Sequence, residues 1–267
     1  DKNLVPNELM DVLGARADCH RFDYLGTYFF RFNVTKKPFD DLRVRQAFTL
    51  AVNRAQLIAK VTRSGEKPTS HFTPDGIGVY HPPAGLDYHP DEARKLLAAA
   101  GFPGGRGFPA RSYLFKSDKI DEQVAVELQA MWQKELGVRI ELRQMEPKVY
   151  YNAQSALDYD LSRSSWIGDY NDPNTFLDMF MSNNGNNRTG WANPEYDTLI
   201  REANRLTDPR RRADLLQKAE TMLVHDAIPI VPLYFYAGVN FFDPKKIEGI
   251  YPNLLDEHPL DLIRRKP

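Results

Sequence analysis

The sequence has very little cysteine: Cys19 stands alone among 267 residues. A single cysteine excludes an internal disulfide framework and any zinc site built from cysteines. Long hydrophobic runs are also lacking, since no apolar stretch approaches the roughly 20 residues of a membrane span. Nor is there a surplus of one charge, because 35 Lys and Arg nearly cancel 36 Asp and Glu. Nucleic-acid-binding proteins usually carry a basic excess, so we expect no nucleic-acid partner.

Common catalytic motifs are absent as well. The chain contains no Gly-x-Ser-x-Gly elbow, no Walker loop and no His-Glu-x-x-His pair. The glycine-rich run at 104–107 follows a predicted helix rather than a strand, which favours a turn over a phosphate-binding loop. His81 and His89 share one loop, but no predicted helix carries two histidines at metal-ligand spacing. We therefore expect no metal and no cofactor.

Helical and strand patterns alternate along the chain, which predicts an α/β fold. Strands are predicted at 24–34, 111–115, 138–144, 159–166 and within 227–239. Helices are predicted at 6–13, 42–61 (with Asn53 as a break or a cap), 91–100, 120–136, 149–156, 175–181, 193–206 and 208–225. The βαβαβ run over 111–166 predicts parallel pairing with right-handed crossovers. Residues 64–90, rich in Pro and Gly, are predicted to form a long ordered loop.

The segment from Ser162 to Pro173 has the features of a binding site. A predicted strand delivers Arg163 and Trp166 to its end, and an acid-amide-acid cluster follows a glycine that permits a sharp turn. Ligands in open α/β sheets commonly bind at strand ends. Trp166 offers a flat apolar face, and Asp169 offers a negative charge for an ammonium group.

A capped turn is the alternative interpretation of the same segment. In it, Asp172 is the N-cap of the next helix and Pro173 is the first helical residue. We expect Asp172 to serve as that cap, but a cap alone leaves Trp166, Asp169 and Asn171 unexplained. Both interpretations therefore stay open on the chemistry of the residues.

Three stretches of the chain carry a family resemblance. Residues 38–48 read PFDDLRVRQAF and are followed by Asn53-Arg54, residues 166–173 read WIGDYNDP, and residues 193–234 run from NPEYD to IPIVPLY. These motifs, in this order, resemble the large periplasmic solute-binding proteins of peptide-type ABC importers, known as family 5. The likeness extends over nearly the whole chain.

The resemblance implies a two-lobed clamp, or Venus-flytrap fold, whose lobes close about a hinge and bury the ligand between them. Because family members are longer than this chain, we expect it to be the carboxy-terminal α/β lobe, without the amino-terminal lobe. Residues 1–23 would form the link from that lobe and residues 24–240 the ligand-binding lobe. Residues 241–267 would form a tail returning toward the amino-terminal lobe.

The resemblance also implies roles for individual residues. Asp169 corresponds to the acid that meets the α-ammonium group of a peptide, a charge-assisted contact. Trp166 corresponds to a residue lining the pocket nearby, and Arg163 to an arginine that can meet the ligand carboxylate. The backbone at Ser164 and Ser165 corresponds to main chain that pairs with an extended peptide.

Four further positions complete the expected ligand-binding set. Tyr24 and Phe29 lie in the strand that faces the pocket in relatives, and Tyr170 and Asn171 lie in the ligand loop. Gln154 departs from the family, because a second basic residue of peptide binders corresponds to this position. Because this basic residue is missing, the peptide length preference, and peptide binding itself, need not follow those of the family's peptide binders.

The implied function is that of the solute-binding component of an ABC importer, in the periplasm or at the cell surface. It binds di- or oligopeptides between the lobes and delivers them to a permease in the inner membrane, without catalysis. A non-peptide solute, such as a saccharide, an opine or a metal chelate, is the alternative within the family. From another class, a hydrolase could use Asp169 and Asp172 as paired carboxylates.

Overall fold

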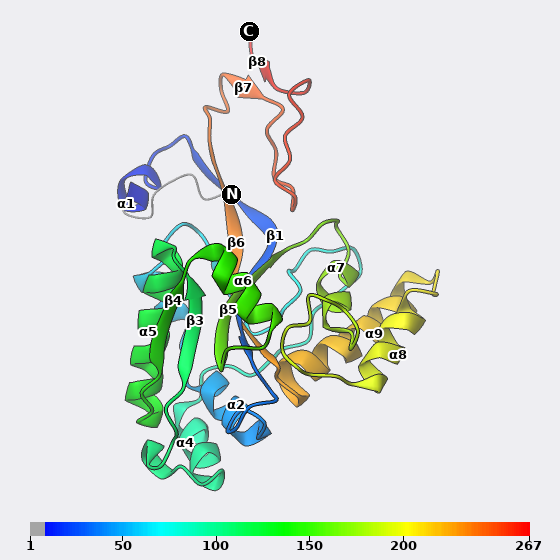
Figure 1. Ribbon diagram of the computed structural model, residues 1–267. Helices are drawn as coiled ribbons and strands as arrows, with labels where there is room; N and C mark the ends of the chain where they lie inside the picture. The colour runs from blue at the N-terminus through cyan, green and yellow to red at the C-terminus, as the bar shows by residue number, and fades with distance from the viewer. Residues whose placement is uncertain (1–8) are drawn as a thin grey trace.

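A six-stranded mixed sheet forms the centre of the computed structural model, which describes residues 9–267 (Figure 1). Its strands lie in the order β2-β6-β1-β5-β3-β4. They are β1 (Cys19–Phe32), β2 (Lys67–Pro68), β3 (Ser112–Lys116), β4 (Glu141–Met145), β5 (Leu161–Ile167) and β6 (Ile230–Phe241). Strand β1 is antiparallel to β5 and β6, whereas β3 is parallel to β4 and β5. The parallel pairing predicted for the βαβαβ run is therefore confirmed.

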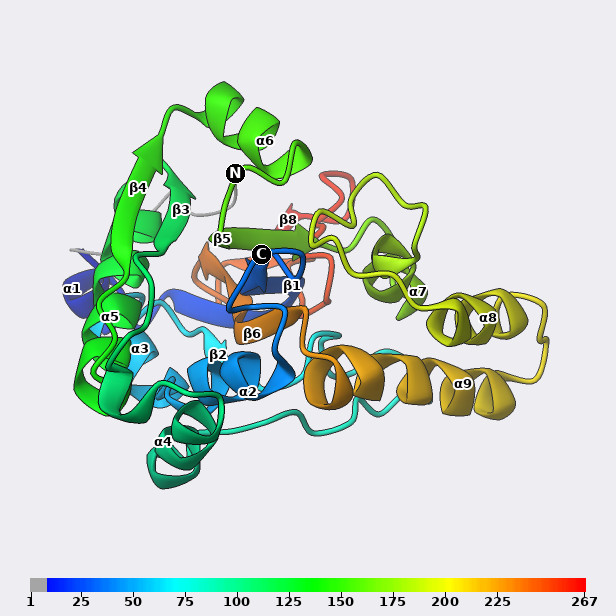
Figure 2. The same cartoon turned by 60° about the horizontal axis from the view of Figure 1, so that its bottom comes forward.

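Helices surround this sheet and match the predicted pattern closely. They are α1 (Met10–Leu13), α2 (Leu42–Leu50), α3 (Arg54–Lys60), α4 (Pro90–Ala99), α5 (Lys119–Leu136), α6 (Pro147–Ser155), α7 (Asn174–Leu177), α8 (Pro194–Ala203) and α9 (Pro209–Thr221). A π-helical turn at Met222–Asp226 extends α9. Figure 2 shows α8 and α9 side by side, on the opposite side of the molecule from α5.

Side-chain caps set the ends of several helices. Asn53 accepts a hydrogen bond from the N–H of Gln56, so the predicted break at this residue is the cap of α3. The side chain of Asp118 likewise accepts from the first N–H groups of α5. That helix ends at Gly137, whose φ of 69° is left-handed and suits a residue without a Cβ. The cap on α5 fixes the start of a helix that contributes to the candidate site.

The two larger of three apolar clusters lie on opposite faces of the sheet, because neighbouring strand side chains point to opposite sides. One core packs α2, α4 and α5 against the sheet and includes Phe30 and Trp132, whose rings meet edge to face at 5.5 Å. The other packs α7, α8 and α9 and includes Phe29 and Phe180. Both faces of the sheet are thus filled by side chains, which leaves its rim for a ligand.

Two differences from the expectations affect the sheet. Strand β1 begins at Cys19 and not at Tyr24, because residues 19–23 pair with Ala237 to Phe241 of β6. These five residues therefore belong to the sheet and not to a link. The loop at 64–90 contains the two-residue strand β2, which pairs with Phe235 and Tyr234. A two-residue strand that follows Gly65 and itself contains Pro68 gives no strand signal in the sequence.

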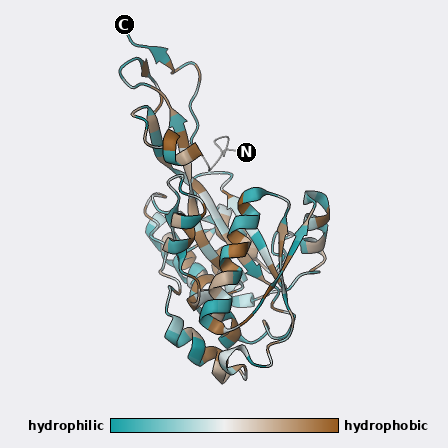
Figure 3. Cartoon of the chain, turned by 90° about the vertical axis from the view of Figure 1, so that its left-hand side faces the viewer, coloured by the Kyte–Doolittle hydropathy of each residue, from teal (hydrophilic) through white to brown (hydrophobic). Residues whose placement is uncertain are grey.

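The carboxy-terminal tail extends away from the sheet (Figure 1, Figure 3). Within it, β7 (Ile247–Glu248) and β8 (Arg264–Arg265) form an antiparallel pair. The helix predicted at 6–13 is present from Met10 onward, and residues 6–8 of that prediction lie outside the described residues. Among residues 9–267, no helix is long and apolar enough to cross a membrane.

Candidate ligand-binding site

A pocket of about 430 Å³ opens where β3 and β5 end beside the start of α5. We name it the tyrosine pocket. Its lining residues are Tyr24, Tyr28, Lys116, Asp118, Ile120, Asp121, Tyr151, Arg163, Ser165, Ile167, Tyr234, Tyr236 and Ala237. Strand β5 contributes every second residue, Arg163, Ser165 and Ile167, as the alternation of strand side chains requires. Arg163, Ser165 and Tyr24, three of the sequence-predicted residues, meet at this pocket.

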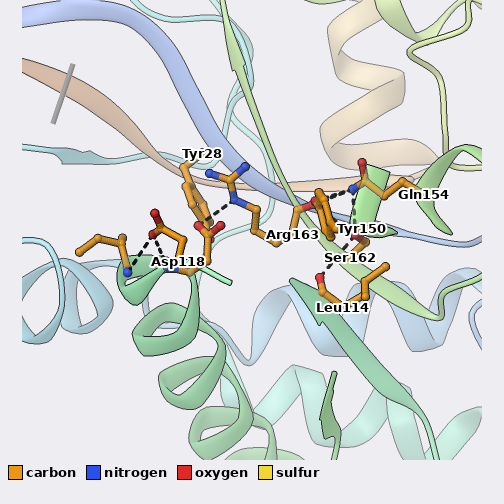
Figure 4. A network of polar contacts seen from close by, with 9 residues as sticks. Tyr28, Leu114, Asp118, Tyr150, Gln154, Ser162 and Arg163 are labelled. Carbon is orange, nitrogen blue, oxygen red and sulfur yellow. Dashed lines mark hydrogen bonds and ion pairs between the residues drawn. The ribbon is translucent and has the colours of Figure 1, made fainter. Parts of the chain in front are cut away.

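A buried charge pair forms one wall of the tyrosine pocket (Figure 4). The Nε of Arg163 donates to Oδ1 of Asp121 at 2.8 Å, and the hydroxyl of Tyr28 donates to the same oxygen at 2.9 Å. The guanidinium lies over the Tyr28 ring, 4.7 Å from its centre. Burial raises the pKa of Asp121, although the charge of Arg163 opposes this shift. Within the described part of the chain, Oδ2 of Asp121 is buried without a hydrogen-bond partner, at a cost of about 1–3 kcal/mol.

The other predicted residues of β5 face the opposite side of the sheet. Oγ of Ser164 accepts a hydrogen bond from Nε of Arg31 at 3.1 Å. Trp166 packs against the second core, and its buried indole N–H has no partner in residues 9–267. Phe29 is fully buried in that core beside Phe72, so its side chain does not reach the ligand surface, contrary to the expectation. The predicted set is therefore divided between two faces of the sheet.

The backbone of β5 has one open edge. The N–H of Gly168 donates to the carbonyl of Leu25, so the backbone groups of Trp166 and Ser164, two and four residues earlier, also face β1. Those of Arg163, Ser165 and Ile167 face the other way, toward β3. Pairing with β3 stops at Leu114 and Ser162, so beyond this point Ser165 and Ile167 face an edge that no strand of residues 9–267 pairs with.

Gln154 holds the strand at the point where this open edge begins (Figure 4). Its Nε2, which has two hydrogens to donate, lies within hydrogen-bond distance (2.7 to 2.8 Å) of the hydroxyl of Tyr150, Oγ of Ser162 and the carbonyl of Arg163. The hydroxyl of Tyr150 donates to the same carbonyl. Gln154 is only 2% exposed. It therefore acts as a structural support of β5, a role that its sequence position did not reveal.

The loop after β5 presents exposed polar groups. Asp169 is exposed, and its backbone N–H donates to Oγ1 of Thr175. Burial, together with the negative charge of Asp169, raises the pKa of Asp178 on the following 3₁₀ turn. Tyr170 is 46% exposed and Asn171 is also exposed. The loop therefore offers an exposed carboxylate and an aromatic ring beside the end of β5.

Asp172 is engaged within the protein. Its two oxygens accept from the two terminal nitrogens of Arg212 at 2.7 Å each, and Oδ1 also accepts from the N–H of Asn174 at 2.8 Å. The predicted capping contact thus exists, but α7 begins at Asn174, one residue later than expected. Paired with Arg212, Asp172 is a structural residue, and it does not form a free carboxylate pair with Asp169.

Sequence reasoning missed Tyr28 and Asp121. A register argument could have found Tyr28, because it lies four residues from Tyr24 in the same strand and therefore on the same face. By the same parity, Phe29 lies on the face opposite to Tyr24. Asp121 looked like an ordinary acidic residue in the first turn of a helix. Only the tertiary fold brings it to Arg163.

An α/β lobe with an open strand edge beside a polar pocket is the kind of structure that binds small extended ligands. The family model for bacterial extracellular solute-binding proteins, family 5 (middle region), matches residues 5–188. The dipeptide-binding protein DppE of Bacillus subtilis is 34% identical over 277 residues, which cover 100% of this chain and 49% of DppE. The chain belongs to family 5 of the bacterial extracellular solute-binding proteins.

Two further relatives show how wide the similarity is. The crystal structure of OppAIV, a periplasmic oligopeptide-binding protein of an ABC transporter from Borrelia burgdorferi, superposes with a TM-score of 0.87 at 32% identity. That match covers 99% of this chain and 53% of OppAIV. YgiS of Escherichia coli K12, a probable deoxycholate-binding periplasmic protein, is 33% identical over 82% of this chain and 42% of its own length. The chain spans about half the length of these relatives, which are binding proteins rather than enzymes.

Proposed function

We propose that the chain is the carboxy-terminal lobe of an extracytoplasmic solute-binding protein that binds di- or oligopeptides for an ABC importer. The observation that carries this proposal is the open edge of β5. There, Ser165 and Ile167 keep backbone donors and acceptors with which an extended peptide can pair. Relatives named for dipeptide and oligopeptide binding support the proposal.

Asp169 gives the peptide a direction. Residues of an extended chain are spaced by about 3.3 Å, so an α-ammonium group at Asp169 leaves the following peptide residues alongside Ile167 and Ser165. Two outward-facing residues pair with a segment of about three peptide residues. The exposed Tyr170 and Asn171 lie on the same loop and complete this end of the site.

A second lobe would cover the open edge and exclude water from the bound peptide. In this arrangement residues 24–240, with the first part of β1, form the ligand-binding lobe, and residues 241–267 lead toward the second lobe. Bound ligand favours the closed state, which a permease in the inner membrane recognises. The protein acts in the periplasm or at the cell surface, and the ligand leaves unchanged.

The second candidate is a non-peptide solute. Two tyrosines of the pocket, Tyr151, which is 47% exposed, and the half-buried Tyr236, offer amphipathic rings to a sterol or a sugar as readily as to a peptide. The similarity to YgiS favours this alternative. Native mass spectrometry of the full-length protein, purified without denaturation, separates the two candidates by the mass of the ligand that co-purifies.

The contact at Asp169 is tested with a free tripeptide and its N-acetylated form. We expect acetylation to weaken binding to the wild type by about tenfold or more, because it removes a charge-assisted contact. Asp169→Asn should weaken binding of the free peptide to a similar degree and add little to the effect of acetylation. Isothermal titration calorimetry measures both effects.

Asp214→Asn provides the control for this titration. It removes the same charge from an exposed position on α9, so we expect wild-type affinities. Equal affinity of the free and acetylated peptides for the wild type contradicts the role of Asp169. Failure of every peptide to bind contradicts the proposed function itself.

A further inference from the structure

The tyrosine pocket contains a cation whose charge is already matched. Arg163 and Asp121 are joined at 2.8 Å, and their side chains are only 9% and 2% exposed. An arginine in this position is expected to attract a ligand carboxylate, but this guanidinium already has a carboxylate partner inside the protein. The formal charges lining the pocket also cancel, since Lys116 and Arg163 are balanced by Asp118 and Asp121.

The same pair leaves one acceptor unused. Both donors to Asp121, Tyr28 and Arg163, bind Oδ1, whereas Oδ2 is buried with no hydrogen-bond partner among the described residues. An ionised carboxylate only accepts hydrogen bonds, so a donor alone can satisfy Oδ2. Asp121 is 1% exposed and lines the pocket, which makes the pocket the side from which such a donor can come.

We infer, resting on the proposed function, that the tyrosine pocket receives a non-anionic side chain of the peptide that donates a hydrogen bond to Asp121. A carboxylate in the pocket gains little from Arg163, because Asp121 neutralises it, and it is repelled by Oδ2. An amide, a hydroxyl or an ammonium group instead satisfies the unpaired oxygen. The pocket thereby selects between Gln and Glu, two side chains of nearly equal size.

The geometry of β5 explains how a side chain reaches this pocket. The side chains of Ser165 and Ile167 line it, while their backbone groups face the open edge. Side chains of a paired peptide alternate between the two faces, as they do in the strand. One face of the peptide therefore projects toward the tyrosine pocket, and selectivity is expected at one peptide position and not at its neighbours.

The inference is tested with tripeptides that carry Glu or Gln at each position in turn, titrated into the full-length protein by calorimetry. At one position, we expect Gln to bind at least about tenfold more tightly than Glu. Asp121→Asn should abolish or reverse this preference for Gln over Glu, because it removes the repelling charge and frees Arg163 for a carboxylate. Arg163→Met, a second variant that keeps Asp121, should increase the preference for Gln, because it leaves the charge of Asp121 without its cation.

Glu122→Gln is the matched control. It makes the same change of charge one residue further along α5, at an exposed position outside the pocket, and should leave the Gln-to-Glu ratio unchanged. Peptide binding without discrimination at any position overturns this inference and leaves the proposed function intact. An equal response to Glu122→Gln and Asp121→Asn also overturns it. Failure of every tripeptide to bind overturns the proposed function, and this inference with it.

Discussion

Two buried carboxylates, Glu220 and Asp121, show how differently the two sides of this molecule are built. Glu220, on α9, is fully buried, and both of its oxygens are used. Oε1 accepts from the backbone N–H groups of Phe72 and Thr73 at 2.7 and 2.8 Å, and Oε2 accepts from the hydroxyl of Tyr80. Asp121 has a cation beside it, yet one of its oxygens has no partner in the described chain.

The difference indicates which region is complete and which is open to a ligand. Glu220 fastens the loop around residues 72–80 to α9, and both of its oxygens accept hydrogen bonds within the protein. The region around Asp121 keeps an unpaired oxygen, and the neighbouring strand keeps an unpaired backbone edge. Buried polar groups are normally satisfied. Exceptions occur elsewhere in residues 9–267, among them Oγ1 of Thr73 and the indole N–H of Trp166, but the unpaired Oδ2 of Asp121 belongs to the lining of the tyrosine pocket, where a ligand can supply a donor.

The largest expected effect concerns the closed region. Glu220→Ala removes the acceptor from three buried donors, and we expect it to lower the free energy of unfolding by at least about 3 kcal/mol. Chemical denaturation measures the loss, and peptide selectivity should not change. Glu220→Gln retains the shape and one acceptor, so its loss should be smaller. A loss below about 1 kcal/mol for Glu220→Ala would show that the network around Glu220 is not essential.

A smaller effect is expected in the pH dependence of stability. Burial raises the pKa of Glu220 above its ordinary 4.5, although its three donors oppose this change. The folded protein therefore binds the carboxyl proton of Glu220 more tightly than the unfolded chain does. This difference stabilises the fold at low pH and is lost as pH rises above 4.5 and through the raised pKa, so the free energy of unfolding falls over that range.

Glu220→Gln isolates this contribution. Thermal unfolding of the wild type and the variant should be compared from about pH 4 to about pH 8, a range that begins below the ordinary pKa of a glutamate. The stability difference between them should change in favour of the variant as pH rises, because only the wild type must lose the buried proton. A difference that is constant over this range would contradict the raised pKa.

Much of the fold was predictable because its signals are local. Periodicity predicted the strands and helices of the βαβαβ run, and Asn53, predicted as a break or a cap, is the cap of α3. The start of β1 was not predictable in this way, because His20, Arg21 and Asp23 interrupt the apolar pattern there, and residues 19–23 become a strand by pairing with β6. Local pattern fails where a distant partner decides the conformation.

The candidate site was predictable only in part, for the same reason. The chemistry of residues 162–173 indicated Arg163 and Asp169, and the family resemblance added Ser164 and Ser165 as one stretch of ligand-pairing backbone. The fold separates Ser164 and Trp166 from Ser165, and it buries Phe29. The partner of Arg163 lies 42 residues earlier in the chain, and nothing near Asp121 in the sequence indicates this contact.

Amide hydrogen exchange along β5 tests the central claim, that a peptide pairs with the open edge. In the free protein, the N–H groups of Ser165 and Ile167 should exchange faster than those of Ser164 and Trp166, which face β1. A bound tripeptide should slow exchange at Ser165 and Ile167 by at least about tenfold and change the other two little. Unchanged exchange at Ser165 and Ile167, under conditions where calorimetry shows the peptide bound, would contradict the account.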